Sequence, residues 1–237
     1  MKVLITGAAG SGSSYLIEHL VKNTCSEIYA LVRWHSTSSL KNLVNVKEKI
    51  NIVECDLCDL SNVIRVLRDI VPEYVYHLAS HANVRVCFES PISVFQNNVN
   101  CTLNLFEALR ILEQRPIVHI SATSESYGNP MITPITEDCP TEPVNIYAVS
   151  KLTQEKIAKS YWHSYRIPVV LTRAFAYLNP RREDLFSSAF AKQIVEIENG
   201  QRKILEHGNL DSIRTLCDVR DMMEAYVIAT QRCNLGE

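Results

Sequence analysis

Short runs of apolar and β-branched residues alternate along the chain with longer segments of helical periodicity. This alternation is typical of βαβ units that build a parallel sheet. The runs predict strands at Lys2–Thr6, Glu27–Val32, Ile50–Glu54, Tyr74–Leu78, Ile117–Ser121 and Val169–Thr172. The longer segments predict helices near Tyr15–Lys22, Asp59–Ile70, Ile92–Glu113, Tyr147–Ser164, Ser187–Glu198 and Val219–Thr230. We therefore predict an α/β protein with a Rossmann-like, doubly wound parallel sheet.

From Asn179 the pattern loosens into a polar segment, one helix and a second polar segment. We predict a Rossmann domain over residues 1–175 and a smaller, partial lobe over residues 176–237 that is interleaved with it. The chain stops at residues 233–237, directly after a predicted helix, where the alternation calls for a further strand. We interpret this end as a truncation of the smaller C-terminal lobe.

Composition indicates an ordinary globular protein, since 46% of the 237 residues are hydrophobic and 21% are charged. The 24 Lys and Arg residues against 26 Asp and Glu give a formal net charge of -2. Such a balance argues against nucleic acid or an anionic membrane as a partner. No apolar run is long enough to span a membrane, and MKVLITG at the start is strand-like and unlike a secretion signal. We expect a cytoplasmic protein.

Eight cysteines are scattered along the chain, and only Cys55 and Cys58 form a close pair. A CxxC pair can be a redox motif or half of a zinc site, but no second pair or suitably spaced histidines accompany it. We interpret the cysteines as reduced and structural. The seven histidines show no metal-binding spacing. We predict no metal, and we interpret His77 and His119, in strand patterns, as satisfied core histidines.

A glycine-rich motif, TGAAGSGS, follows the first predicted strand and leads into the first helix. Glycine lets the backbone approach a pyrophosphate closely, and a helix N-terminus offers N–H groups and a partial positive charge to it. The competing interpretation is an ordinary strand-to-helix turn. The candidate phosphate-binding residues are Gly7, Gly10, Ser11, Gly12 and Ser13.

The loop after the second strand normally distinguishes the two nicotinamide cofactors, because a carboxylate there binds a ribose hydroxyl and repels a phosphate. Here the loop, VRWHSTSS, has no carboxylate, while Arg33 and several hydroxyls can bind the 2′-phosphate of NADP. We predict NADP, with NAD as the less favoured cofactor. A solvated loop arginine is the alternative. Asp56, after the third strand, can accept from an adenine amino group or simply occupy an exposed turn.

Two further clusters are candidates for the reacting groups. Tyr147 and Lys151 are four residues apart on a predicted helix, so both project from one face, and a nearby ammonium stabilises a phenolate. Thr123, Ser124 and Glu125 follow the fifth strand, at the carboxyl edge where such sheets bind ligands. Turn and capping roles are the alternative for the hydroxyls. A nicotinamide-dependent oxidoreductase is expected to have a glycine-rich motif, then hydroxyl residues after a strand, then a helix with Tyr and Lys. This chain has all three in that order.

With these motifs the whole chain resembles the extended short-chain dehydrogenase/reductase family, in its nucleotide-sugar epimerase/dehydratase branch. The glycine motif, the arginine-and-serine loop and Thr123-Ser124-Glu125 are most similar to the GDP-mannose 4,6-dehydratases, which are lyases. The segments FAKQIVEIENG and GNLDSIRTLCDVRD resemble the companion GDP-4-keto-6-deoxymannose reductases at least as closely. The resemblance implies a nucleotide-sugar substrate and a homodimer or homotetramer, in which the helices near Ile92–Glu113 and Tyr147–Ser164 form a four-helix contact.

The resemblance also implies roles for single residues. Tyr147 takes the proton of the sugar C4 hydroxyl, Lys151 lowers the pKa of Tyr147 and holds the nicotinamide ribose, and Thr123 binds the same sugar oxygen. In a dehydratase Glu125 removes the C5 proton and Ser124 helps water leave C6. In a reductase, supplied NADPH reduces a C4 ketone instead and Glu125 only shapes the pocket. Further cofactor contacts are implied at Asp56, Leu57, Leu78 and Ala79, and contacts with the substrate diphosphate at Arg182 and Arg214.

Three positions depart from the family pattern. Ser13 stands where the third glycine of the motif belongs, Ala176 where the family has a substrate-contacting Asn, and Asn179 where it has Gly. The chain also ends before the last part of the substrate lobe of its relatives. The alternatives to a 4,6-dehydratase are therefore a GDP-4-keto-6-deoxymannose reductase, a nucleotide-sugar 4-epimerase, and a non-catalytic NADP-binding module with a degraded site.

Overall fold

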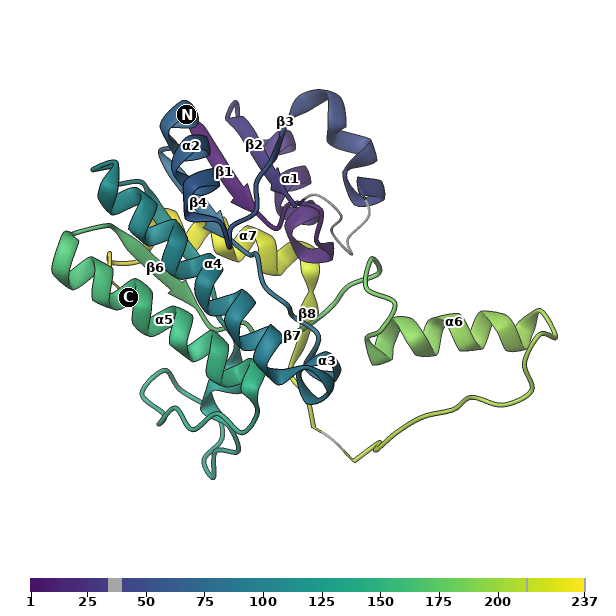
Figure 1. Ribbon diagram of the computed structural model, residues 1–237. Coiled ribbons are helices and arrows are strands. Elements are labelled where there is room, and N and C mark those ends of the chain that lie inside the picture. Colours follow the sequence, from purple (N-terminus) through teal and green to yellow (C-terminus); the bar gives the residue numbers. More distant parts are fainter. Residues whose placement is uncertain (34–39, 212, 237) are drawn as a thin grey trace.

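The computed structural model describes residues 1–33, 40–211 and 213–236. Its centre is a six-stranded parallel sheet with the strand order β3-β2-β1-β4-β5-β6 (Figure 1). The reversal of strand order beside β1 is the mark of a doubly wound fold. The six predicted strands are thus confirmed. Their observed bounds are β1 Lys2–Thr6, β2 Glu27–Val32, β3 Asn51–Glu54, β4 Tyr74–His77, β5 Ile117–Ser121 and β6 Val169–Thr172.

Helices cover both faces of the sheet, and each face has its own hydrophobic core. Successive residues of β1 point to opposite faces: Leu4 packs in one core, and Val3 and Ile5 pack in the other. Both cores are needed because a parallel sheet is buried on both sides. The first core is formed with α2 Leu60–Ile70, α4 Pro91–Ile111 and α5 Ile146–Tyr165, and the second with α1 Ser11–Asn23, η1 Leu40–Lys49 and α7 Val219–Arg232.

The sequence pattern missed the shorter elements. These are η1, α3 Val84–Glu89, η2 Ser124–Tyr127, and the two strands of a small parallel sheet, β7 Ala176–Leu178 and β8 Leu216–Asp218. β7 and β8 have three residues each, too few to show an alternating pattern. They bring two segments about forty residues apart in the chain side by side, at the base of the loop that carries α6.

The segment between β7 and β8 projects from the body of the molecule (Figure 1). It contains α6 Phe186–Glu198, and none of the thirteen residues of this helix is buried. The chain then returns through β8 into α7, which packs against α1, β5 and β6. In the part of the chain that the structure describes, no helix has the length and apolar character needed to cross a membrane.

Candidate active site

Two loops meet closely at the carboxyl end of β1. Gly7 adopts a φ of +66°, and a Cβ atom on it would lie 2.8 Å from the Cα of Ala79, so only glycine fits there. The loop after β4 is held by the same region, because the N–H of Ala79 donates to Oγ1 of Thr6 (3.1 Å). The predicted cofactor residues Gly7 and Ala79 therefore lie in contact, beside Leu78, which is half-buried.

The N-terminus of α1 faces the segment that leads into the projecting loop. Gly10 is the N-cap residue, and having no side chain it leaves the first N–H groups of α1 to other acceptors. A Cβ atom on Gly12 would lie 3.0 Å from the hydroxyl of Tyr177 in β7. Ser13, which replaces the third glycine, is buried. The helix end thus keeps its N–H groups available to an anion such as a pyrophosphate.

The predicted adenosine end of the site is more exposed. Arg33 is exposed, and its Nη1 donates a long hydrogen bond of 3.4 Å to Oδ1 of Asn97 on α4. The hydroxyl-bearing loop residues that follow it, 36–39, lie outside the described residues. Asp56 is exposed as well, and its Oδ1 accepts from the N–H of Cys58 (2.9 Å). Leu57 is buried, and its carbonyl accepts from Nδ2 of Asn104 (2.9 Å).

Tyr147 lies in the first turn of α5 and is 9% exposed. Burial raises its pKa, and the carboxylate of Glu125 and the hydroxyl of Tyr177 add to this. The charge of Arg182 and a hydrogen bond with Thr123 lower the pKa. Two segments therefore surround the phenol: the turn after β5 with Thr123 and Glu125, and the chain from β7 onward with Tyr177 and Arg182. Burial has the largest effect on its pKa, and Arg182 and Thr123 oppose that effect.

Lys151 follows Tyr147 by one helical turn and is 3% exposed. Burial lowers its pKa to about 8, while the carboxylate of Glu155, one turn further along α5, raises it. Its charge also lowers the pKa of the buried His77 and His119, which burial alone already depresses. Lys151 is thus an ammonium at neutral pH held among uncharged imidazoles, next to the Tyr147 turn.

Glu125 is positioned by a residue that the sequence analysis did not single out. Nδ2 of Asn145 donates to Oε2 of Glu125 (2.8 Å), and Oδ1 of Asn145 accepts from the N–H of Ala148 (2.8 Å) as the N-cap of α5. The N–H of Glu125 donates to Oγ1 of Thr123 (3.3 Å), and the N–H of Ser124 donates to the Ala174 carbonyl (3.0 Å). One asparagine therefore orients the carboxylate and begins the helix that carries Tyr147. An N-cap residue before a predicted helix was the available signal.

A second unpredicted residue, Asn98 of α4, connects three elements below the site. Its Oδ1 accepts from the N–H of His81 (2.7 Å), and its Nδ2 donates to Oγ of Ser150 on α5 (2.9 Å). Its carbonyl accepts from Nε2 of Gln154 (3.0 Å). Asn98 is fully buried, and the network fixes the loop after β4 against the helix of Tyr147 and Lys151.

A partly buried ion pair links the end of β6 to α5. Arg173, at the end of β6, donates to both carboxylate oxygens of Glu155 (2.8 to 3.1 Å) and to the hydroxyl of Tyr127 (2.9 Å). The side chain of Glu155 is only 1% exposed. A bidentate pair of this kind fixes orientation as well as distance. It ties α5, β6 and the turn that follows β5 together around Lys151.

The two predicted substrate arginines have different surroundings. Arg182 is partly buried, donates to the Ala82 carbonyl (2.8 Å) and pairs with Asp184 (2.9 Å), and its charge reaches Tyr147. Arg214 is exposed and has no hydrogen-bond or ion-pair partner among the described residues. The structure therefore brings Arg182 to the cluster of Thr123, Glu125 and Tyr147, and shows no contact of Arg214 with that cluster.

The two buried histidines differ in how many of their ring nitrogens have a hydrogen-bond partner. His77 shares hydrogen bonds of 2.9 Å with Thr6 and Thr102, as a satisfied core histidine should. His119 shares one of 2.8 Å with Thr172, but within the described ranges its Nδ1 has no partner, so the prediction that it is satisfied is wrong for that atom. Across the described residues no group of three or more His, Cys, Asp or Glu side chains is arranged to hold a metal ion.

Comparison with known proteins identifies the family to which the chain is similar. Residues 4–235 match the family model described as GDP-mannose 4,6 dehydratase. A GDP-mannose 4,6-dehydratase from Sordaria araneosa is 32% identical over 96% of this chain, and one from Vibrio cholerae is 31% identical over 98%. This chain spans 42% and 64% of the lengths of these two relatives.

Solved structures share the fold. DesIV, a dTDP-glucose 4,6-dehydratase from Streptomyces venezuelae solved with NAD, superposes with a TM-score of 0.89 at 22% identity over all of this chain and 74% of its own. A UDP-N-acetylglucosamine 4-epimerase from Methanobrevibacter ruminantium gives 0.83 at 27% identity, over 99% and 74%. RMD from Pseudomonas aeruginosa, solved with NADPH, gives 0.84 at 24% identity, over 100% and 76%. The neighbours thus include proteins bound to either nicotinamide cofactor.

Proposed function

The chain belongs to the GDP-mannose 4,6-dehydratase family, and from this membership we propose that it acts as an NADP-dependent nucleotide-sugar 4,6-dehydratase on GDP-mannose. The observation that carries the proposal is the convergence of Thr123, Glu125 and Arg182 on the buried phenol of Tyr147. A 4,6-dehydratase needs a group that removes the C4 hydroxyl proton and a second base that removes the C5 proton. A phenol and a carboxylate held this close provide both.

The cofactor would lie along the carboxyl edge of the sheet. We assign its pyrophosphate to Gly7, Gly10, Ser11, Gly12 and Ser13 at the start of α1, where the glycine backbone leaves room and the N–H groups attract an anion. Its adenosine end would contact Arg33, Asp56, Leu57, Leu78 and Ala79. When bound, the nicotinamide supplies the acceptor and donor of hydride. Arg33 favours NADP over NAD because a guanidinium matches a phosphate.

The first chemical step requires a proton acceptor at the C4 hydroxyl. Tyr147 would accept this proton, with Thr123 donating a hydrogen bond to the same sugar oxygen. The positive charge of Arg182 lowers the pKa of Tyr147 against the larger effect of burial. We assign the same action on the phenolate to Lys151, one helical turn away. Burial keeps Lys151 at a pKa of about 8, so it still carries its charge at neutral pH. It would also hold the nicotinamide ribose.

The second step requires a base at C5, whose hydrogen is acidified once C4 is a ketone. Glu125 would take this proton, held in place by the amide of Asn145. Ser124 would assist the departure of water from C6. Arg182, together with Arg214 from the segment before β8, would bind the diphosphate of the sugar nucleotide. We assign this substrate role to residues 176–237, as distinct from the cofactor role of residues 1–175.

The reaction itself tests the proposal. Purified protein with catalytic NADP and GDP-mannose should form a 4-keto-6-deoxy sugar without net formation of NADPH. The product is measured by mass spectrometry and the cofactor by its absorbance. If NADPH is instead consumed stoichiometrically and only a 4-keto sugar is accepted, the protein is the reductase. A C4 epimer as product would indicate the epimerase. Cofactor binding without any turnover, across GDP-, dTDP-, UDP- and CDP-hexoses, would indicate a non-catalytic module.

Cofactor choice has its own test. Replacing Arg33 by Ala should weaken NADP binding by about tenfold, the value of a hydrogen bond between charged groups, and leave NAD binding unchanged. Lys41→Ala, a change of an exposed cation in the neighbouring η1, is the matched control. Calorimetric titration with both cofactors measures the difference. Equal losses for NADP and NAD would contradict the assignment of the 2′-phosphate to Arg33.

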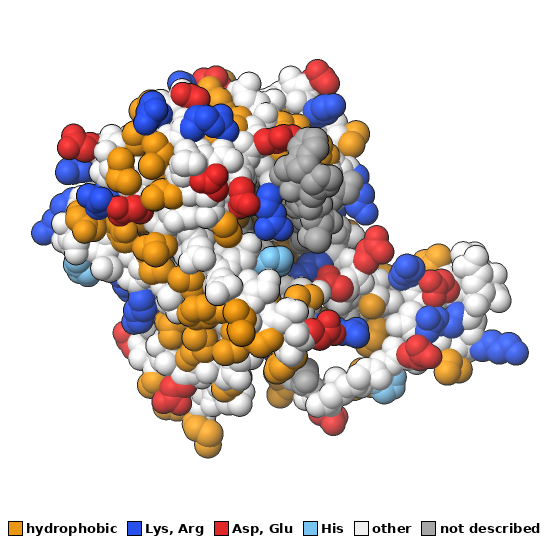
Figure 2. Space-filling view, in the orientation of Figure 1, with side chains coloured by type: hydrophobic (Ala, Val, Ile, Leu, Met, Phe, Trp, Pro, Cys, Tyr) orange, Lys and Arg blue, Asp and Glu red, His pale blue; other side chains and the backbone are white. Residues whose placement is uncertain are grey.

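We also propose that the protein forms a homodimer through α4 and α5. Figure 2 shows hydrophobic side chains gathered over these two helices. On these helices Leu103, Ile111 and Tyr165 are 40 to 45% exposed. Pairing α4 and α5 with those of a second copy would cover these side chains in a four-helix contact. Sedimentation of the wild type and of Leu103→Lys tests this, with a monomeric variant as the expected result.

A further inference from the structure

A pair of cysteines outside the proposed catalytic cluster lies in sulfur-to-sulfur contact. Sγ of Cys58, in the loop between β3 and α2, is 3.6 Å from Sγ of Cys101 on α4. Cys101 is buried and Cys58 is exposed. A disulfide needs its sulfur atoms about 2.05 Å apart, so a shift of roughly 1.5 Å by the loop side chain would suffice. The contact joins residues 43 positions apart in the chain.

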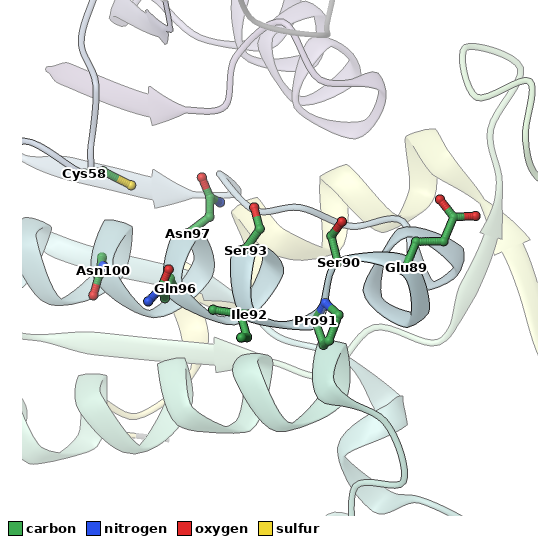
Figure 3. A pocket seen from close by; sticks show the side chains of 9 residues that line it. All are labelled: Cys58, Glu89, Ser90, Pro91, Ile92, Ser93, Gln96, Asn97 and Asn100. Carbon is green, nitrogen blue, oxygen red and sulfur yellow. The ribbon is translucent and has the colours of Figure 1, made fainter.

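The Cys58 thiol opens onto a groove that a small molecule can enter. Figure 3 shows Cys58 on one wall, and side chains of α4, among them Ser93, Asn97 and Asn100, on the other. The groove has a volume of about 670 Å³, and five of its nine lining residues carry hydroxyl or amide groups, with Cys58, Glu89, Pro91 and Ile92 as the others. Neither Tyr147 nor Glu125 lines it. Such a polar lining suits a peptide-like thiol compound such as glutathione.

We propose that Cys58 and Cys101 form a reversible disulfide by exchange with a low-molecular-weight disulfide of the glutathione type. The thiolate of Cys58 attacks one sulfur of that disulfide, which forms a mixed disulfide and releases the first small thiol. Cys101, after giving its proton to water, attacks Sγ of Cys58 and releases the second small thiol. Two protein thiols are thereby oxidised, and one small disulfide is reduced to two thiols.

The geometry favours Cys101 over Cys55 as the partner, although Cys55 and Cys58 form the CxxC sequence. Cys55 is buried in the core, and its N–H donates to the Val32 carbonyl (2.9 Å) at the end of β2. Burial raises the pKa of both Cys55 and Cys101, so the internal step should be slow and should accelerate as the pH rises. The mixed disulfide at Cys58 should therefore appear before the internal one.

The disulfide would act on the predicted adenosine site, and this part of the inference rests on the proposed function. Asp56 accepts from the N–H of Cys58 (2.9 Å), so pulling Cys58 toward α4 would move the carboxylate assigned to the adenine. The loop is already tied to α4 by the hydrogen bond from Asn104, one turn beyond Cys101, to the Leu57 carbonyl. Loss of the adenine hydrogen bond to a charged carboxylate predicts about tenfold weaker NADP binding in the oxidised protein.

The experiment treats the full chain with oxidised glutathione at pH 8 and maps its peptides by mass spectrometry without reduction. The expected product is a Cys58–Cys101 cross-link that dithiothreitol removes. Cys58→Ser should abolish it, Cys101→Ala should stop the reaction at a glutathione adduct on Cys58, and Cys25→Ser, which removes another exposed thiol, should change nothing. A Cys55–Cys58 link, or a wild-type reaction that ends at the adduct, would overturn the assignment of the pair.

Calorimetric titration of the reduced and cross-linked protein with NADP then tests the consequence. Weaker binding by about tenfold, restored by dithiothreitol and absent in Cys58→Ser, supports the regulatory part of the inference. Equal affinities in both states would overturn it. If neither state binds NADP, the cofactor assignment of the proposed function fails, whereas the peptide map still decides the disulfide.

Discussion

Two helices of similar kind, α5 and α6, are held in very different ways. α5 buries seven of its residues, including Tyr147 and Lys151, against the sheet and α4. α6 buries none, although Phe186, Ile194 and Val195 are about half exposed on it. Tyr147 and Lys151 therefore lie on an element fixed by the packed core, whereas α6, in the proposed substrate segment, has no buried residue. Chemistry that needs accurate geometry is placed where packing is dense.

The largest expected effect is on the chemistry of α5. Tyr147→Phe should lower kcat by about 10²- to 10⁴-fold, because the general base at C4 is lost, while NADP binding stays nearly unchanged. Turnover of GDP-mannose and a calorimetric NADP titration measure the two quantities. Tyr165→Phe, at the exposed end of the same helix, is the control and should keep full activity. An undiminished rate for Tyr147→Phe would remove the mechanism.

The next largest effect should be on the free energy of unfolding, which we compare for a variant in the packed core beneath α5 and a variant on α6. Phe106→Ala on α4, which removes a fully buried ring packed beneath α5, should cost about 3 to 5 kcal/mol of the free energy of unfolding. Phe186→Ala on α6 should cost no more than about 0.5 kcal/mol, because its side chain is half exposed. Urea unfolding measures both. Similar losses for the two variants would mean that α6 is as firmly packed as α4, contrary to the comparison.

Acid should destabilise the sheet region through its buried histidines. Burial lowers the pKa of His77 and His119 from 6.5 to about 3, so between these values the unfolded chain binds more protons than the folded one. The free energy of unfolding should therefore fall as the pH drops below 6.5, by about 1.4 kcal/mol per pH unit for each histidine.

Single substitutions test this acid effect. His119→Gln should reduce the slope of the unfolding free energy against pH by the contribution of one histidine, about 1.4 kcal/mol per pH unit. His207→Gln, in the exposed segment after α6, should leave this slope unchanged. Urea unfolding between pH 4 and pH 7 gives the slopes. An identical slope for the wild type and His119→Gln would contradict the assignment of the acid effect to that imidazole.

The smallest expected effect tests whether the two regions communicate. The charge of Arg182, on the segment that leads into α6, lowers the pKa of Tyr147. Arg182→Gln should therefore move the acid limb of the kcat/KM profile to higher pH by a fraction of a unit, and Arg182→Lys should restore it in part. Arg202→Gln, which removes an arginine paired with Glu196 of α6, should leave the limb in place. A shift of equal size in both would contradict a specific action of Arg182.

Local sequence determined most of the sheet and its helices. Most of the six strands are apolar runs with several buried residues, the edge strand β3 excepted, and the alternating helical segments are long enough to show their period. The glycine motif could also be placed, because its position between a strand and a helix follows from the chain itself. Gly7 illustrates this: its positive φ and its contact with Ala79 leave no room for a side chain. The short strands β7 and β8 were not predicted, because three residues are too few to show an alternating pattern.

Tertiary structure decided what surrounds each reactive group. Only the fold brings Asn145 to Glu125 and Arg182 to the phenol of Tyr147. It also decided that Cys58 meets Cys101 rather than its sequence neighbour Cys55. Periodicity records which side of a helix or strand is buried, but contacts between distant segments depend on how those elements pack. The physical reason is that burial and neighbouring charge, which set pKa values and reactivity, are properties of the packed chain and not of a motif.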